Sequence, residues 1–312
     1  MSAAELRIEA IGLERSFGHR TAVAGLTLRV AAGVVYGLVG PDGAGKTTSL
    51  RMVAGLLDPS AGHVRLLGRD PFAGGRAVRE TLGYMPQQYS LYGDLTVAEN
   101  LAFFGEMFCL PRDALARRRQ RLLAMTRLEP FTTRRVAALS GGMYKKLALA
   151  CALLHEPKVL LLDEPTNGVD PVSRREFWDL LHEFLAEGMA IVLATPYMDE
   201  AARCHQTGLL YQGRLLEEGT PAELLQAFPH AVFSIRGDRD EIERLMASRD
   251  DVLGFTPAGA RLRIVVEHGR EQTVLAVLNE AGAQATPAPA TFEDVFLARV
   301  REQRRASARR AA

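Results

Sequence analysis

Short apolar runs alternate with helical patterns along most of the chain. Residues 6–11, 21–30 and 34–39 are β-branched and aliphatic stretches separated by glycine and charged residues, and they predict strands. The third stretch runs directly into Gly40. From position 46 to position 56 the apolar residues recur at helical spacing. The pattern therefore predicts a strand, a glycine-rich loop and a helix in direct succession.

The middle of the chain has a helical pattern. Thr96 is a candidate N-cap with Glu99 three residues later, and residues 115–125 form an arginine-rich amphipathic stretch. We interpret residues from about 88 to 150 as a helical subdomain.

Two nearly all-apolar runs follow, at residues 158–162 and 190–194. Such runs are typical of parallel strands that are buried on both faces. The helical pattern of residues 174–187 lies between them and completes a βαβ unit. The fold class predicted is therefore α/β.

Pro229 interrupts this pattern, and a second one begins. Residues 231–236 and 262–267 predict strands, each followed by a helical stretch, at 239–248 and 271–281. This order indicates a small α+β unit of the split βαβ type. Residues 285–290 resemble a Pro/Ala linker, and an arginine-rich tail that we expect to fray ends the chain. We predict two domains, residues 1–228 and residues 229–312.

Composition narrows the function classes. The 312 residues include 38 basic and 37 acidic side chains, a net charge of +1, so no overall positive field attracts nucleic acid, and we expect no nucleic-acid partner. The three cysteines lack the close pairing of a zinc site. No apolar run reaches the ~18–20 residues that span a bilayer. Any membrane association is therefore expected to involve a partner.

The glycine-rich loop fits the phosphate-binding pattern GxxxxGK[ST], and it lies between a strand and a helix as that pattern requires. The backbone N–H groups of such a loop and the positive end of the helix dipole bind phosphate. Lys46 is expected to reach the terminal phosphates of a nucleotide, and the Thr47 hydroxyl to ligate Mg²⁺. The candidate nucleotide-binding residues of this loop are Gly40, Pro41, Asp42, Gly43, Ala44, Gly45, Lys46, Thr47 and Thr48.

An acidic pair ends the apolar run of residues 159–162. Asp163 is the candidate magnesium residue, and Glu164 is the candidate general base that polarises the attacking water. An acidic pair at a strand end is weak evidence alone, but beside a phosphate-binding loop it indicates nucleotide hydrolysis.

The motif Leu139-Ser140-Gly141-Gly142-Met143 resembles the LSGGQ signature of the ABC ATPases, with Met143 in place of glutamine. The resemblance covers roughly residues 6–225. It implies a P-loop ATPase that binds ATP and Mg²⁺ and works as a dimer. In such a dimer Ser140, Gly141 and Gly142 close on the ATP held by the opposite subunit.

The resemblance also assigns three weaker positions. Phe17 matches an aromatic residue that stacks on adenine, Gln87 a catalytic and magnesium-sensing residue, and Asp170 a residue of the loop after the acidic pair. Phe17 could equally be a core residue, and Gln87 an ordinary loop residue in contact with solvent.

The C-terminal segment FEDVFL is similar to the tails of ATPases that serve ABC-2 type exporters, and ATPYMDEA is similar to the first half of fused tandem-ATPase exporters. These similarities imply an ATPase that drives export through ABC-2 type transmembrane permease subunits. It would be held by those subunits at the cytoplasmic face of the cell membrane, as a homodimer or with a second ABC ATPase.

One position departs from the family pattern. Pro196 stands where the family has a histidine that contacts the γ-phosphate, and proline offers no donor. Either Tyr197 or His205 could supply the missing contact. The alternative function is a degenerate subunit with weak hydrolysis that completes the ATP site of another ATPase.

Overall fold

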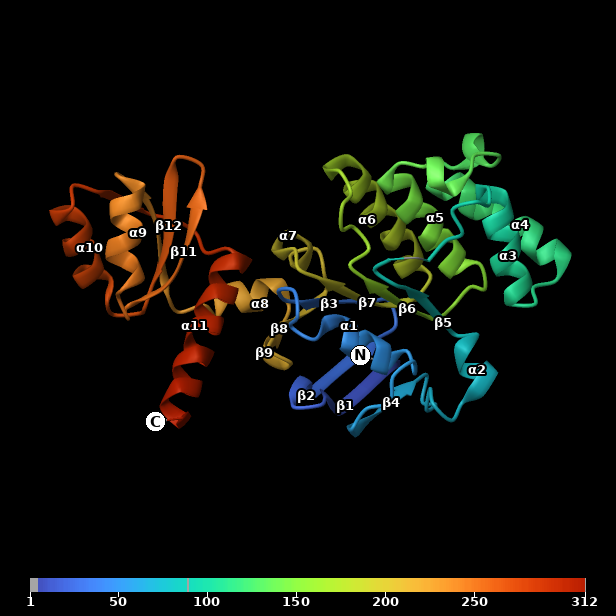
Figure 1. Cartoon of the computed structure of the whole chain (residues 1–312), viewed down its shortest axis with the longest axis horizontal. Helices are drawn as coiled ribbons and strands as arrows, with labels where there is room; N and C mark the ends of the chain where they lie inside the picture. The colour runs from blue at the N-terminus through green and yellow to red at the C-terminus, as the bar shows by residue number, and fades with distance from the viewer. Residues whose placement is uncertain (1–4, 89, 312) are drawn as a thin grey trace.

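The computed structural model describes residues 5–88 and 90–311 as three sheets with helices packed around them (Figure 1). The strands are β1 (Leu6–Phe17), β2 (Arg20–Ala31), β3 (Val35–Val39), β4 (Ala61–Leu66), β5 (Leu82–Met85), β6 (Val159–Asp163), β7 (Ala190–Thr195), β8 (Gln206–Tyr211), β9 (Arg214–Gly219), β10 (Ala231–Arg236), β11 (Val252–Ala258), β12 (Arg261–Val266) and β13 (Gln284–Pro287).

The helices connect these strands or cover them. They are α1 (Lys46–Val53), α2 (Gly75–Arg79), α3 (Val97–Met107), α4 (Arg112–Thr126), α5 (Gly141–Leu153), α6 (Pro171–Ala186), α7 (Met198–Ala201), α8 (Pro221–Gln226), α9 (Arg239–Ala247), α10 (Glu271–Glu280) and α11 (Phe292–Ala311), with 3-10 turns at Glu129–Phe131 and Val136–Ala138. Within the described ranges, every helix is too short or too polar to cross a membrane.

The largest sheet has the order β5-β6-β7-β3-β8-β9, and only β9 runs antiparallel to its neighbour. Leu160 and Leu162 of β6 pack with the core beneath α3, α5 and α6, whereas Val159 and Leu161 pack with α1 and the antiparallel sheet β2-β1-β4. Both faces of β6 are therefore covered, which explains its uniformly apolar sequence. The predicted α/β class and the βαβ unit β6-α6-β7 are confirmed.

Three helices occupy much of residues 97–153. α3 begins with a complete capping box in which Thr96 accepts from the Glu99 N–H and the Glu99 carboxylate accepts from the Thr96 N–H, as the sequence indicates. α4 and α5 pack beside α3 over one face of the large sheet (Figure 1).

The C-terminal residues form an antiparallel sheet with the order β11-β12-β10-β13. With α9 and α10 in the two crossovers, the chain order is βαββαβ, the split βαβ arrangement that the sequence predicts. The expected linker at 285–290 is wrong in part, because Gln284–Pro287 forms the edge strand β13. Proline is tolerated there since an edge strand leaves one row of N–H groups unpaired.

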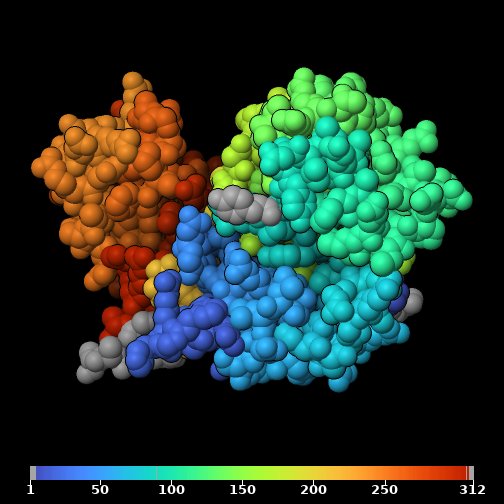
Figure 2. All heavy atoms as spheres, turned by 45° about the vertical axis from the view of Figure 1, so that its right-hand side comes forward, coloured from blue at the N-terminus to red at the C-terminus, as the bar shows by residue number. Residues whose placement is uncertain are grey.

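The expected frayed tail is also wrong, since α11 continues to Ala311. Two of its arginines have partners on the ATPase side: Arg299 pairs with Glu217, and Arg304 donates to the Tyr211 hydroxyl. Phe292 and other apolar residues of α11 pack on Val39, the last residue of β3. Figure 2 shows the C-terminal sheet with its helices as a separate lobe, mostly orange, beside the N-terminal part of the molecule.

One buried ion pair joins α11 to the C-terminal sheet. Asp294 is fully buried, and both of its carboxylate oxygens accept from the Arg263 guanidinium at 2.7–3.0 Å. One of those oxygens also accepts from the Thr291 N–H at 2.7 Å.

We expect Asp294→Ala to lower the free energy of unfolding by up to about 3–5 kcal/mol, because it leaves the partly buried Arg263 guanidinium without its carboxylate partner. Denaturant unfolding of the full chain measures this. The matched control is Asp250→Ala: the Asp250 side chain is 96% exposed and pairs loosely with Arg301 and Arg305, so its loss should cost below about 1 kcal/mol. Equal effects of the two substitutions would contradict the structural role of Asp294.

Candidate active site

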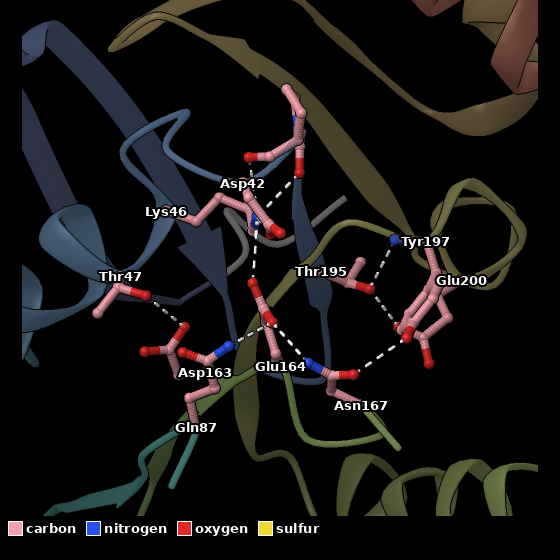
Figure 3. A network of polar contacts seen from close by, with 12 residues as sticks. Asp42, Lys46, Thr47, Gln87, Asp163, Glu164, Asn167, Thr195, Tyr197 and Glu200 are labelled. Carbon is pink, nitrogen blue, oxygen red and sulfur yellow. Dashed lines mark hydrogen bonds and ion pairs between the residues drawn. The ribbon is translucent and has the colours of Figure 1, made fainter. Parts of the chain in front are cut away.

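The carboxyl ends of four neighbouring strands meet at one edge of the large sheet. Gln87 follows β5, Asp163 and Glu164 end β6, Thr195 ends β7, and the loop to Lys46 follows β3. Parallel strands place their carboxyl ends at the same edge, so residues far apart in the sequence lie together (Figure 3).

The glycine-rich loop wraps around the start of α1. Gly45 has φ +109°, and a Cβ there would lie 2.4 Å from the Ala22 carbonyl oxygen, so only glycine fits. Lys46 follows as the first residue of α1 and is 4% exposed. Its ammonium group donates to the carbonyl oxygens of Gly40 at 2.8 Å and Pro41 at 3.1 Å. The predicted strand, loop and helix are therefore present.

The loop is joined to the acidic pair by two contacts. Lys46 Nζ lies 3.2 Å from Glu164 Oε1, and the Thr47 hydroxyl donates to Asp163 Oδ1 at 3.0 Å. Both carboxylates are at least 95% buried. Burial raises the pKa of Asp163, and the hydrogen bond from Thr47 opposes that shift.

Glu164 is held in an unusual backbone conformation and by two amides. Its φ is +48°, in the left-handed region that non-glycine residues rarely adopt, which is typical of functional sites. Gln87 Nε2 donates to Glu164 Oε2 at 2.7 Å, and Asn167 Nδ2 donates to the same oxygen at 3.2 Å. The sequence analysis singled out Gln87 but not Asn167.

Lys145 is a further residue that the sequence analysis did not select. It lies on α5, and its ammonium group donates to the Gln87 carbonyl at 3.0 Å and contacts the Glu164 carbonyl at 3.5 Å. Burial lowers its pKa. The signal in the sequence is a lysine placed among the apolar residues of a buried helix.

A cavity of about 470 Å³ lies over this edge. Its lining residues are Phe17, Arg20, Ala22, Asp42, Gly43, Gly45, Lys46, Thr47, Thr48, Gln87 and Glu164. Phe17 is 51% exposed at the end of β1, so it is a rim residue and not part of the core. Arg20 lines the same rim and was missed, because an isolated arginine near a turn carries no pattern.

The signature motif lies on a separate surface. Ser140 caps α5 and accepts from the Met143 N–H at 3.3 Å, and Asp170 caps α6 by accepting from the N–H groups of Val172 and Ser173. Gly142 lies against the start of α6, where an added Cβ would be 2.5 Å from Ser173 Oγ. Among the described residues, the lining of the 470 Å³ cavity includes none of Ser140, Gly141, Gly142 or Asp170.

The structure decides between the two candidates for the missing histidine contact. His205 lies at the amino end of β3, where its Nδ1 accepts from the Val35 N–H, so it is at the sheet edge opposite Lys46. The prediction for His205 is therefore wrong. Tyr197 lies on the correct side, and its hydroxyl donates to Asn167 Oδ1 at 3.2 Å (Figure 3).

Known proteins identify the family. The ABC transporter family matches residues 23–167. The Nod factor export ATP-binding protein I of Paraburkholderia xenovorans (strain LB400) is 38% identical over 300 residues, which are 94% of this chain and 96% of that protein. The chain belongs to the ATP-binding subunits of ABC transporters, a family of ATP hydrolases.

Further relatives of this chain belong to the same ABC family. The probable multidrug ABC transporter ATP-binding protein YbhF of Escherichia coli (strain K12) is 47% identical over 237 residues, 75% of this chain. The chain spans 41% of the length of that relative. The solved ATP-binding subunit of an ABC transporter and cbiO1 of Clostridium perfringens superpose with TM-scores of 0.63 and 0.65, at 28% and 27% identity. Each covers 78% of this chain, which itself covers 94% and 96% of theirs.

The site of this ABC ATPase fits a nucleotide with its metal. A Cβ at Gly40 would lie 2.1 Å from the Leu210 carbonyl oxygen, so only glycine fits at the first position of the loop. The buried carboxylate of Glu164 pairs with the Lys46 ammonium group, and the buried carboxylate of Asp163 accepts from the Thr47 hydroxyl. The nearby hydroxyl of Thr47 and carboxylate of Asp163 are the oxygen donors that Mg²⁺ prefers.

Proposed function

We propose that this chain binds and hydrolyses ATP to drive export of a substrate through partner membrane subunits. The single observation that carries the proposal is the meeting of Lys46, Gln87 and Glu164 in one cavity at the carboxyl edge of the sheet. Steady-state Mg-ATP turnover of the purified chain tests it.

Each residue of the cavity has a role in the proposal. Lys46 and the backbone N–H groups at the start of α1 bind the phosphates, and the ring of Phe17 stacks on the adenine from the rim. Glu164 accepts the proton of the attacking water, because its carboxylate is already fixed by Gln87 and Asn167. Because the carboxylate is already in position before the reaction, no free energy is spent on reorienting it during the reaction.

Mg²⁺ would be held by Thr47, Asp163 and Gln87, and when bound it would neutralise charge that develops on the phosphate oxygens. The Thr47 hydroxyl and Asp163 already lie 3.0 Å apart, so these oxygen donors need little rearrangement.

A dimer is part of the proposal. Ser140, Gly141 and Gly142 form a helix N-terminus that binds anions, and it lies outside the cavity of its own chain. Each motif would therefore close on the ATP of a second subunit, with Asp170 beside it. The second subunit is another copy of the chain or a different ABC ATPase.

The partner surface is an apolar groove of about 350 Å³ between the end of α1 and α3. Leu56 and Met107 line it and are 65% and 55% exposed, and Ser90, three residues after Gln87, also lines it. We assign this groove to a cytoplasmic segment of an ABC-2 type permease, because a contact there is continuous with the loop that holds the base. That contact would place the chain at the cytoplasmic face of the membrane.

Export is the direction that the relatives support. The names of two relatives refer to Nod factor export and to a multidrug transporter.

Residues 1–228 would form the ATPase domain, with the helical subdomain at about 88–150. Residues 229–312 would form a C-terminal domain whose last helix, α11, packs against the ATPase domain.

A second candidate function rests on Pro196, which sits in the loop between Thr195 and Tyr197 and has no donor. In that case the chain's own site hydrolyses ATP weakly, and its signature motif completes a faster site on another ATPase subunit.

The substitution Pro196→His separates the two functions. We expect it to raise kcat at least about tenfold, because one preorganised donor to a developing charge is worth roughly 10²–10³ in kcat at ideal geometry. Steady-state turnover measures this, and the control is Pro196→Ala, which removes the ring without adding a donor. A substantial native rate that is equal in the native chain and both variants would rule out the degenerate function.

A further inference from the structure

Resting on the proposed hydrolysis, we propose that Tyr197 is a positioning residue for Glu164 and acts through Asn167. The loop after β7 thus supports the base by a hydrogen-bonded relay, although its first residue, Pro196, has no donor to offer.

The relay consists of two consecutive hydrogen bonds. The Tyr197 hydroxyl donates to Asn167 Oδ1 at 3.2 Å, and Asn167 Nδ2 donates to Glu164 Oε2 at 3.2 Å (Figure 3). The carboxylate of Glu164 can only accept, so it selects the –NH₂ end of the amide. The Tyr197 hydroxyl then holds the opposite end, Asn167 Oδ1, and limits movement of the amide away from the base.

The two bonds matter because Glu164 has few other restraints on that side. Lys46 holds Oε1, and Gln87 shares Oε2 with Asn167. Without Asn167 the carboxylate could rotate about the Gln87 contact. Positioning of a catalytic group to within a fraction of an ångström strongly affects rate.

Both ends of the relay are themselves held. The Arg174 guanidinium lies 4.4 Å from the centre of the Tyr197 ring, and the Tyr197 N–H donates to the Thr195 hydroxyl at 3.0 Å. Thr195 in turn donates to the buried carboxylate of Glu200, which also accepts from the Thr166 hydroxyl. Thr166 immediately precedes Asn167, so Glu200 ties the loop of the base to the loop of Tyr197.

The test compares Tyr197→Phe, Asn167→Ala and the double variant by steady-state ATP turnover of the full chain. Tyr197→Phe removes only the hydroxyl, so we expect kcat to fall about 3- to 10-fold, the range of one net hydrogen bond, with KM for Mg-ATP unchanged. Asn167→Ala should lower kcat at least as much. The double variant should be no slower than Asn167→Ala, because the hydroxyl reaches the base only through the amide.

Two controls separate the possible outcomes. Tyr211→Phe removes a hydroxyl that accepts from Arg304 of α11 and is not part of the relay, and it should leave kcat unchanged. Glu164→Gln should lower turnover by about 10²- to 10⁴-fold. An active chain that needs Glu164 but keeps its native kcat after Tyr197→Phe, or shows additive losses in the double variant, would overturn the relay alone. A chain without turnover, or one that does not need Glu164, would overturn the proposed hydrolysis and the relay together.

Discussion

Glu164→Gln should reduce ATP turnover by about 10²- to 10⁴-fold, the contribution of a well-placed general base. The amide keeps the size of the side chain, and its oxygen can still accept from Gln87 and Asn167, although the ion pair with Lys46 is lost. It cannot accept the proton of the attacking water. Steady-state release of phosphate from Mg-ATP measures the loss.

Binding of ATP should survive this substitution. A ligand that binds only the folded state raises the midpoint of thermal unfolding, and we expect Mg-ATP to raise it in the Glu164→Gln variant as in the native chain. The matched control is Glu187→Gln on the exposed surface, where the carboxylate pairs with Arg121. It should keep full turnover. Retained turnover in Glu164→Gln would show that another group is the base.

Lys46→Ala should weaken both turnover and ATP binding. The Lys46 ammonium group lies inside the phosphate loop. It donates to the carbonyl oxygens of Gly40 and Pro41 and pairs with Glu164. Its loss removes a charge-assisted contact to the phosphates, so we expect affinity for ATP to fall at least about tenfold. We expect kcat to fall by a further 10²- to 10³-fold, roughly the cost of one lost electrostatic contact.

Thermal unfolding distinguishes this loss from that of the base. The Lys46→Ala variant should show little stabilisation by Mg-ATP at concentrations that stabilise Glu164→Gln. Lys158→Ala, at an exposed position, is the matched control and should behave as the native chain. An unchanged stabilisation by ATP in Lys46→Ala would place the phosphates outside the glycine-rich loop.

The sequence predicted the parts of the site that local spacing controls. Lys46 and Thr47 follow a glycine loop at fixed distances, and Asp163 and Glu164 end an apolar run, so each pair could be placed at a strand end. The same locality explains why the Thr96 cap and the β6-α6-β7 unit were predicted well. The two residues of the cap are three positions apart, and the paired strands β6 and β7 follow each other with one helix between them.

The errors occur where distant segments decide the structure. Gln284–Pro287 became a strand because the edge of β10 was available for pairing, which composition does not reveal. The expected frayed tail is part of α11, in which Arg299 and Arg304 bond to Glu217 and Tyr211, more than 80 positions earlier. His205 was considered for the site although Val35 holds it at the opposite edge of the sheet.

By itself, the sequence determined the family, the phosphate loop, the acidic pair and the order of elements, because motifs and periodicity are encoded over a few residues. Only the tertiary structure decided that Asn167 and Tyr197 reach Glu164 and that Lys145 supports Gln87. These contacts depend on the strand order β5-β6-β7-β3, which brings four loops to one edge. That order follows from the packing of whole elements, so local pattern alone could not supply it.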